Sequence, residues 1–98
     1  MFIARVIGNV WATRKHSGLK SAKMLIVRAM DPLTDKLTGE ATMAVDGGVG
    51  AGPGDVVLVV DEGGSAGKIL KIDKAPVRTV ICGVVDEVIS RSFRKKYA

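Results

Sequence analysis

Apolar residues recur along this chain with the spacing that is typical of β-strands. From residue 2 to residue 13 they alternate with polar residues, which places Ala4 and Val6 on one face and Arg5 on the other. Period two over a dozen residues predicts a long strand with one buried face. Gly8 interrupts the pattern, and we expect a bend or a β-bulge there.

Four further apolar runs predict strands because they are short, rich in β-branched residues and bounded by glycine, proline or polar segments. Pro32 ends the first of these runs, since proline cannot donate to a ladder. Ser65 predicts the cap of a short helical turn over residues 65–70. The four predicted strands are residues 24–30, 41–45, 56–60 and 77–85.

Five short strands punctuated by glycine and proline are typical of a small barrel. The sequence therefore predicts one all-β domain over residues 1–98, a partly open five-stranded barrel of the oligonucleotide-binding (OB-like) type. Near the end of the chain, Ile89, Phe93 and Tyr97 are four residues apart, which is the spacing of an apolar stripe on a helix. We therefore expect a short terminal helix over residues 87–98.

The glycines are concentrated in one loop. Half of the 12 glycines fall between Gly47 and Gly63. Glycine tolerates positive φ and lets another backbone approach closely, so this run predicts a tight loop with few side chains. Asp46 and Asp55 flank it and can accept hydrogen bonds from its N–H groups. The sequence thus indicates backbone-to-backbone contact, with an ordinary long turn as the alternative.

Composition bears on whether the chain associates with itself. Of its 98 residues, 47% are apolar and only four are aromatic. A chain of this length has a modest core, and this much aliphatic surface is more than such a core readily hides. The excess favours a subunit that buries part of its surface against copies of itself. A compact monomer rich in valine and alanine is the alternative.

Charge is segregated along the chain, whose net charge is +5. Residues 1–30 carry six bases and no acid, residues 31–62 carry seven acids and one base, and bases return in the tail 91–97. Basic surfaces attract nucleic acid, acidic protein or membrane, and they also keep proteins soluble. A nucleic-acid-binding OB-fold that uses this surface is therefore the alternative function, although only Trp11 offers a base-stacking aromatic on an early strand.

Catalytic and metal chemistry find little support. The only histidine is His16, in a polar loop, and the only cysteine is Cys82, so the usual metal-ligand clusters cannot form. The glycine loop contains neither of the two common phosphate-binding motifs, and a predicted strand follows it where those motifs need a helix. We expect no enzyme activity, no cofactor and no metal. Cys82 is expected to be a small core residue, and a single cysteine fits a reducing cytoplasm.

Motifs spread nearly end to end carry a resemblance to a known family. Their order is fairly specific, although each piece alone is weak. The motifs are residues 7–10, 13–15 with Leu19, 24–28, 44–46, 50–52, 54–59, 64–66 and 83–86. The chain resembles the pentameric vertex proteins of bacterial microcompartments (EutN/CcmL type), which occur in carboxysomes and in ethanolamine-utilisation and related catabolic shells.

The resemblance implies an OB-like barrel that assembles into a homopentamer, caps the vertices of an icosahedral shell in the bacterial cytoplasm and has no enzymatic activity. Its implied partners are itself and hexameric or pseudohexameric shell proteins. The expected subunit interface is Asp46, Gly50, Ala51, Gly52, Gly54, Asp55, Ser65 and Ala66. The candidates for docking against shell tiles are Arg14, Lys15, Lys20, Arg28 and Arg78.

Two stretches depart from the family pattern. The family often has an arginine after the Ser-Ala pair, where this chain has Gly67, so a contact of that arginine is missing or passes to Lys68. The basic, aromatic-tipped tail 91–97 has no counterpart in the pattern.

Overall fold

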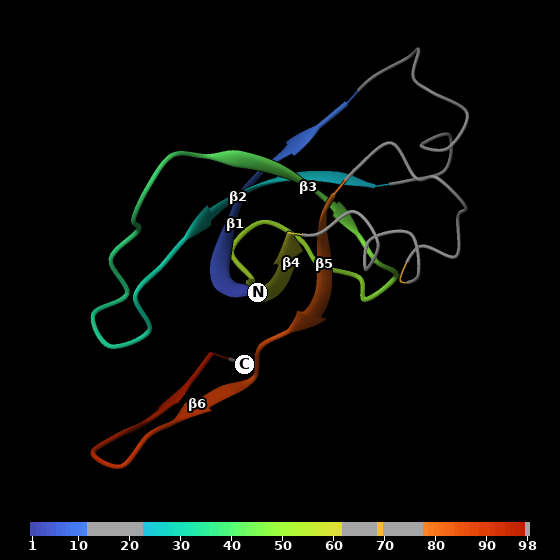
Figure 1. The fold of residues 1–98 in the computed structure, drawn as a ribbon. Coiled ribbons are helices and arrows are strands. Elements are labelled where there is room, and N and C mark those ends of the chain that lie inside the picture. Colours follow the sequence, from blue (N-terminus) through green and yellow to red (C-terminus); the bar gives the residue numbers. More distant parts are fainter. Residues whose placement is uncertain (12–22, 62–68, 70–77, 98) are drawn as a thin grey trace.

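The computed structural model describes residues 1–11, 23–61, 69 and 78–97, which form a closed barrel and a separate two-stranded sheet (Figure 1). The barrel strands follow the order β1-β2-β3-β5-β4. They are β1 (Phe2–Val10), β2 (Met24–Ala29), β3 (Thr42–Asp46), β4 (Val56–Asp61) and β5 (Thr79–Val84). The second sheet pairs β6 (Glu87–Ile89) with β7 (Arg94–Lys96). The all-β, five-stranded prediction is confirmed.

The alternation in β1 places its residues as the sequence predicts. Ala4 and Val6 are buried in the barrel, whereas Ile7 is exposed. The pairing with β2 runs from Val6–Val27 directly to Gly8–Ile26, so Ile7 is the extra residue of a bulge. The expected irregularity at Gly8 is therefore confirmed, one residue earlier than the glycine itself.

Small aliphatic side chains fill the barrel, and Phe2 and Val84 pack against them. The fully packed members are Ala4, Val6, Leu25, Val27, Ala44, Ala51, Val57, Val59 and Ile81. Cys82 is not among them, contrary to prediction. The β4–β5 pairing skips it between Leu58–Gly83 and Val59–Ile81, so Cys82 is half-buried, with its thiol 3.5 Å from the Leu58 carbonyl oxygen.

A short parallel contact closes the barrel, which corrects the expectation of a partly open one. Val45 pairs with Val80 and Asp46 with Ile81. The Gly47 N–H then donates to the Ile81 carbonyl at 2.9 Å. A Cβ built at Gly47 would lie 2.6 Å from that same oxygen, so only glycine allows the closing strands to approach this far.

The expected terminal helix is wrong, because residues 87–96 form a β-hairpin. Glu87 pairs with Lys96 and Ile89 with Arg94, and the Ser90 N–H donates to the Phe93 carbonyl at 2.9 Å to close the turn. A single apolar stripe gives a twelve-residue helix little stability in water. Contacts with a distant loop favour the hairpin instead, as described below.

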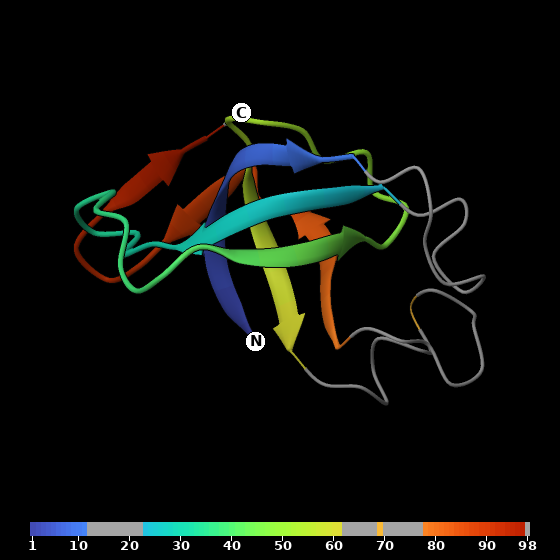
Figure 2. The same cartoon turned by 90° about the horizontal axis from the view of Figure 1, so that it is seen from above.

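The hairpin and the 31–38 connection between β2 and β3 lie side by side at one end of the molecule in both views (Figures 1 and 2). The first part of the glycine loop between β3 and β4 lies toward the opposite end, and the loop then runs back across the molecule toward the C-terminus (Figures 1 and 2). Within the described part of the chain, no helix is long and apolar enough to cross a bilayer. The helical turn predicted for residues 65–70 lies outside the described residues, apart from Ile69.

Candidate subunit interface

The Asp46 carboxylate organises the first half of the glycine loop. Its Oδ1 accepts hydrogen bonds from the N–H groups of Gly48 and Val49, both at 2.9 Å. Its Oδ2 accepts from Gly50 and Ala51, both at 3.1 Å. Hydrogen bonds to a charged acceptor are among the stronger ones in proteins, so four of them fix the loop backbone firmly. The predicted hydrogen bonding of Asp46 to loop N–H groups is confirmed, and its place in a subunit interface stays a prediction.

The second half of the loop is fastened to itself and to β1. The Asp55 carboxylate accepts from the Gly52 N–H at 2.9 Å, as predicted. The Gly54 N–H donates to the Val6 carbonyl at 2.8 Å, and the Val6 N–H donates to the Asp55 carbonyl at 2.9 Å. The loop is therefore a rigid extension of the barrel.

Two cations, one on β1 and one just before β2, bind loop carbonyls. The Arg5 guanidinium donates from Nη1 to the Gly54 carbonyl at 2.9 Å. The Lys23 ammonium donates to the Ala51 carbonyl. With the carboxylates binding N–H groups and the cations binding carbonyls, much of the loop's backbone polarity is satisfied within the chain.

The five glycines from 47 to 54 differ in why they are glycine. Close approach explains Gly47, and positive φ explains Gly48 (97°), Gly50 (75°) and Gly54 (92°). Gly52 has neither reason: its φ is not positive, and a Cβ built there meets no described atom within 4 Å. Among the described residues, nothing therefore requires position 52 to be glycine.

The side chain of Ala51, one of the predicted interface residues, lies inside the barrel. This side chain is fully buried in the core of its own barrel. Its methyl group is therefore a core contact and not a free interface group. Only its backbone, whose N–H binds Asp46, runs with the loop surface.

The other predicted residues are scattered. Ser65 and Ala66, and the docking candidates Arg14, Lys15 and Lys20, lie outside the described residues. Arg28 donates from Nε to the Gly39 carbonyl at 2.7 Å. Arg78 is largely exposed and pairs with Asp61 at 3.4 Å. Of the predicted set, the structure therefore brings together Asp46, Gly50, Ala51, Gly52, Gly54 and Asp55.

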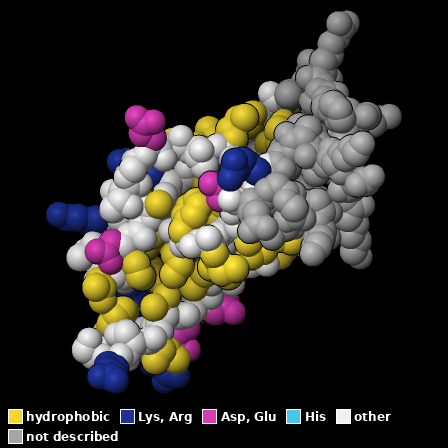
Figure 3. Space-filling view, in the orientation of Figure 1, with side chains coloured by type: hydrophobic (Ala, Val, Ile, Leu, Met, Phe, Trp, Pro, Cys, Tyr) yellow, Lys and Arg dark blue, Asp and Glu magenta, His cyan; other side chains and the backbone are white. Residues whose placement is uncertain are grey.

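Apolar side chains remain on the outside of the barrel. On β1, Ile7 is exposed, as is Trp11 just beyond the strand, and on β3 the side chain of Met43 is 60% exposed. Met43 pairs with Ile26, which pairs in turn with Gly8, so these positions share the outer face. Apolar side chains gather across the middle of the face drawn in Figure 3. The predicted excess of aliphatic surface is thus visible on the chain.

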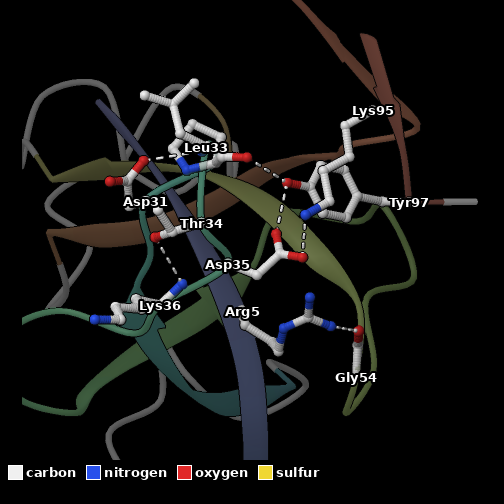
Figure 4. Close-up of polar contacts among 10 residues, drawn as sticks. Arg5, Asp31, Leu33, Thr34, Asp35, Lys36, Gly54, Lys95 and Tyr97 are labelled. Carbon is white, nitrogen blue, oxygen red and sulfur yellow. Dashed lines mark hydrogen bonds and ion pairs between the residues drawn. The ribbon is translucent and has the colours of Figure 1, made fainter. Parts of the chain in front are cut away.

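Sequence reasoning missed a second carboxylate centre, which holds the C-terminal hairpin (Figure 4). Asp35 forms an ion pair with Lys95, and the Tyr97 hydroxyl donates to Asp35 at 3.0 Å. The Tyr97 hydroxyl oxygen also lies 3.3 Å from the Pro32 carbonyl. The Lys95 ammonium lies 5.7 Å from the centre of the Tyr97 ring, within cation–π range.

The electrostatics of this centre follow from its contacts. The hydrogen bond from Lys95 is the main cause that lowers the pKa of Asp35, and the bond from Tyr97 adds to it against partial burial. Burial is the main cause that raises the pKa of Tyr97, and its bond to Asp35 raises it further. Arg5 lowers both pKa values, and it also binds the glycine loop.

A local turn positions Asp35. The Asp31 side chain accepts from the Leu33 N–H at 2.9 Å, and the Asp31 carbonyl accepts from the Asp35 N–H at 2.8 Å. Asp35 itself has φ of 60°, in the left-handed region that aspartate tolerates better than most residues. The Asp31-Pro32 pair marked this turn in the sequence, but nothing there indicated its partners.

Comparisons with known proteins agree with this architecture. A family model described as "Ethanolamine utilisation protein EutN/carboxysome" matches residues 1–86. The chain is 39% identical over 90 residues to a bacterial microcompartment shell vertex protein, EutN, from Escherichia coli K12, covering 92% of each. It is similar to the solved structure of Gloeobacter violaceus CcmL, with a TM-score of 0.84 and 30% identity over 96% of this chain and 94% of that one.

A further solved structure bears on assembly. The chain is similar to the GrpN pentameric microcompartment shell protein from Rhodospirillum rubrum, with a TM-score of 0.78 and 31% identity. The match covers 92% of this chain and 99% of that one.

Proposed function

This chain belongs to the EutN/CcmL family of microcompartment shell vertex proteins, and we propose that it forms a homopentamer that caps the vertices of a bacterial microcompartment shell. Relatives that cover nearly the whole chain carry that function in their names, and one of them is described as pentameric. The role is structural, with no enzymatic activity, and its place is the microcompartment shell in the bacterial cytoplasm.

The observation that carries the assembly is the glycine loop. Its backbone is rigid and its polar groups are largely satisfied inside the chain, yet Gly52 leaves open space that the described residues do not fill. A rigid surface with few side chains is suited to close approach by another backbone. The neighbouring copy in the ring is the partner that this loop fits, with Asp46 and Asp55 holding it in shape.

The barrel's outer apolar face supports the same assembly. Ile7 and Met43 are exposed on the isolated chain, and burying such residues between copies is the usual driving force for obligate rings. At the outer rim, the partners are hexameric and pseudohexameric shell proteins. Arg28 and Arg78, with Arg14, Lys15 and Lys20, are the candidates to meet them.

Native mass spectrometry of the purified chain tests the ring. We expect a five-fold species at micromolar concentration, whereas a stable monomer would contradict the proposal. A hexamer would leave a shell role open but contradict vertex geometry. Co-assembly with shell hexamers tests the cap: we expect shells that stay open at the corners without this protein and close with it.

The nucleic-acid alternative is tested alongside with labelled single-stranded DNA at physiological salt. We expect only weak binding that is lost as salt rises. Micromolar or tighter binding, weakened by reversing the charges of Arg14 and Lys15, together with a failure to close shells, would favour the alternative.

A further inference from the structure

The C-terminal hairpin (residues 87–97) presents a surface that the barrel does not use. Its two strands are three residues each, and such a two-stranded sheet is marginal in water by itself. Contacts from Lys95 and Tyr97 to the 31–38 connection hold it beside the barrel (Figure 4). The family model ends at residue 86, so the hairpin lies outside the part of the chain that the model matches.

Strand alternation gives this hairpin an inner and an outer face. Lys95 and Tyr97 point toward Asp35, so they define the inner face. Cross-strand partners share a face, which places Ile89 with its partner Arg94, and also Lys96, on the outer face. The side chain of Ile89 is 65% exposed there. The outer face therefore combines an apolar side chain with bases and with Glu87, the partner of Lys96, which forms an ion pair with Arg94.

Charge on the hairpin is only partly neutralised within the chain. Residues 87–97 carry four bases and one acid, Glu87. Glu87 pairs with Arg94, and Asp35 pairs with Lys95. Arg91 and Lys96 are exposed and have no ion-pair partner among the described residues. The outer face and the turn thus keep a positive charge that a partner can meet.

A hollow of about 580 Å³ lies at one end of the barrel. It is lined by apolar Phe2 and Val27, by acidic Glu40 and Asp61 and by basic Arg78. Asp61 is already paired with Arg78. Glu40 is exposed and has no hydrogen-bond or ion-pair partner within the described residues.

Glu40 differs from the other acids in the described part of the acidic segment, residues 31–61, because their carboxylates are used inside the chain. Asp46 and Asp55 bind loop N–H groups, Asp31 binds a turn N–H, and Asp35 binds the hairpin. The hollow therefore pairs apolar walls with a carboxylate free to accept a cation.

We propose that the C-terminal hairpin of one copy docks by its outer face on the barrel-end hollow of the next copy around the ring. Ile89 meets the apolar wall, and Lys96 and Arg91 meet Glu40. The inference rests on the proposed ring. A cyclic ring joins unlike surfaces of successive copies, and the hairpin and the hollow are unlike in charge and alike in having apolar content. A second copy is thus favoured over an unrelated acidic protein.

The test uses rings reconstituted from equal amounts of ¹⁴N- and ¹⁵N-labelled chain. A photo-crosslinking amino acid replaces Ile89 in the full-length protein, and native mass spectrometry first establishes that rings form. We expect heavy–light crosslinks from position 89 to the segment around Glu40. The matched control places the same group at Val88, on the inner face, where crosslinks should stay within one chain and reach residues 31–38.

Charge exchange supplies the second measurement. Lys96→Glu and Glu40→Lys should each lower the yield of the position-89 heavy–light crosslink several-fold, because each places like charges opposite one another across the contact. The double variant should recover it, because the pair is then reversed and not removed.

The outcomes separate the two proposals. If rings form but position 89 crosslinks only within its own chain, or to added shell hexamers, or not at all, the docking is wrong and the ring stands. Failure of the charge exchange to restore the crosslink would also contradict it. If no ring forms, the proposed assembly fails first, and this inference fails with it.

Discussion

The glycine loop and the C-terminal hairpin each depend on an aspartate, but the two aspartates act in different ways. Asp46 binds N–H groups two to five residues further along the chain. Asp35 binds side chains 60 and 62 residues away. The loop is therefore specified by its own sequence, whereas the hairpin is specified by a contact that exists only once the barrel has formed.

The two regions also differ in what the contact does. Around Asp46, backbone donors surround a carboxylate, so the loop cannot change shape without losing several charge-assisted bonds at once. Around Asp35, long side chains meet at the surface, where ion pairs contribute little and are screened by salt. We therefore expect the loop to be a fixed part of the barrel and the hairpin to be a separable attachment.

Removing the Asp46 carboxylate should have the largest effect on stability. Asp46→Ala leaves four N–H groups without their acceptor, and we expect a loss of about 3 kcal/mol in the free energy of unfolding. Asp46→Asn keeps one acceptor oxygen and should lose less. Urea denaturation at a fixed protomer concentration measures both. A change in Asp46→Ala below about 0.5 kcal/mol, the usual effect of a surface substitution, would contradict this account.

The regions that the sequence predicted well share this local character. The alternation over residues 2–13 predicted the buried face of β1, and the glycine at position 8 predicted its irregularity. Asp46 and Asp55 were identified because aspartate beside glycines commonly binds nearby N–H groups. In each case the relevant contacts lie within one strand or one turn.

The regions predicted wrongly depend on distant partners. Ile89, Phe93 and Tyr97 have helical spacing, but Tyr97 binds Pro32 and Asp35, which no local pattern could indicate. Barrel closure rests on only two parallel residue pairs. The burial of the Ala51 methyl group in the core depends on how the loop folds back, which a glycine-rich stretch does not indicate, and the predicted place of Ala51 in the subunit interface stays a prediction.

Removing the Asp35 contacts should release the hairpin and leave the barrel intact. Asp35→Asn loses the ion pair with Lys95, and Tyr97→Phe loses the hydroxyl bonds. Hydrogen exchange followed by mass spectrometry should show faster exchange in residues 87–97 in both variants, with exchange in β1 and β4 unchanged. Faster exchange throughout the barrel would mean that the hairpin is part of the cooperative core.

The attachment of the hairpin to its own barrel should depend on pH, because the pKa values of Asp35 and Tyr97 are shifted. Asp35 has a lowered pKa, so its stabilising contribution is complete above the ordinary aspartate pKa and is lost as pH falls through the lower folded value. Tyr97 has a raised pKa, so its contribution is complete below the ordinary tyrosine pKa and is lost as pH rises. We therefore expect both contributions to be complete, and the hairpin to stay attached to its own barrel, between about pH 4 and pH 10.

Tyr97 is the only tyrosine, so its ionisation can be followed by ultraviolet absorbance. The apparent pKa should lie above the ordinary value in the native protein. Asp35→Asn should return it toward the ordinary value, because release of the hairpin removes both the burial of Tyr97 and its bond to Asp35. An ordinary tyrosine pKa in the native protein would contradict the contact between Tyr97 and the 31–38 connection.

Gly52 should show the smallest effect on the chain's own stability and the clearest effect on assembly. A Cβ there meets no described atom, so Gly52→Leu should leave the circular dichroism and secondary structure of the barrel unchanged. Gly83→Ala is the matched control, since a Cβ at Gly83 lies in ordinary contact, 3.7 Å from Leu58 Cβ, within the chain. Ala51→Phe is unsuitable, because overpacking the core would cost roughly 1–3 kcal/mol and confuse unfolding with disassembly.

Native mass spectrometry of Gly52→Leu, beside the unaltered chain and Gly83→Ala, tests most directly whether the glycine loop is a subunit contact. The account predicts pentamers for the unaltered chain and for Gly83→Ala, and folded monomers or smaller species for Gly52→Leu. Intact pentamers of Gly52→Leu at the same protomer concentration would contradict it and place the contact elsewhere on the barrel.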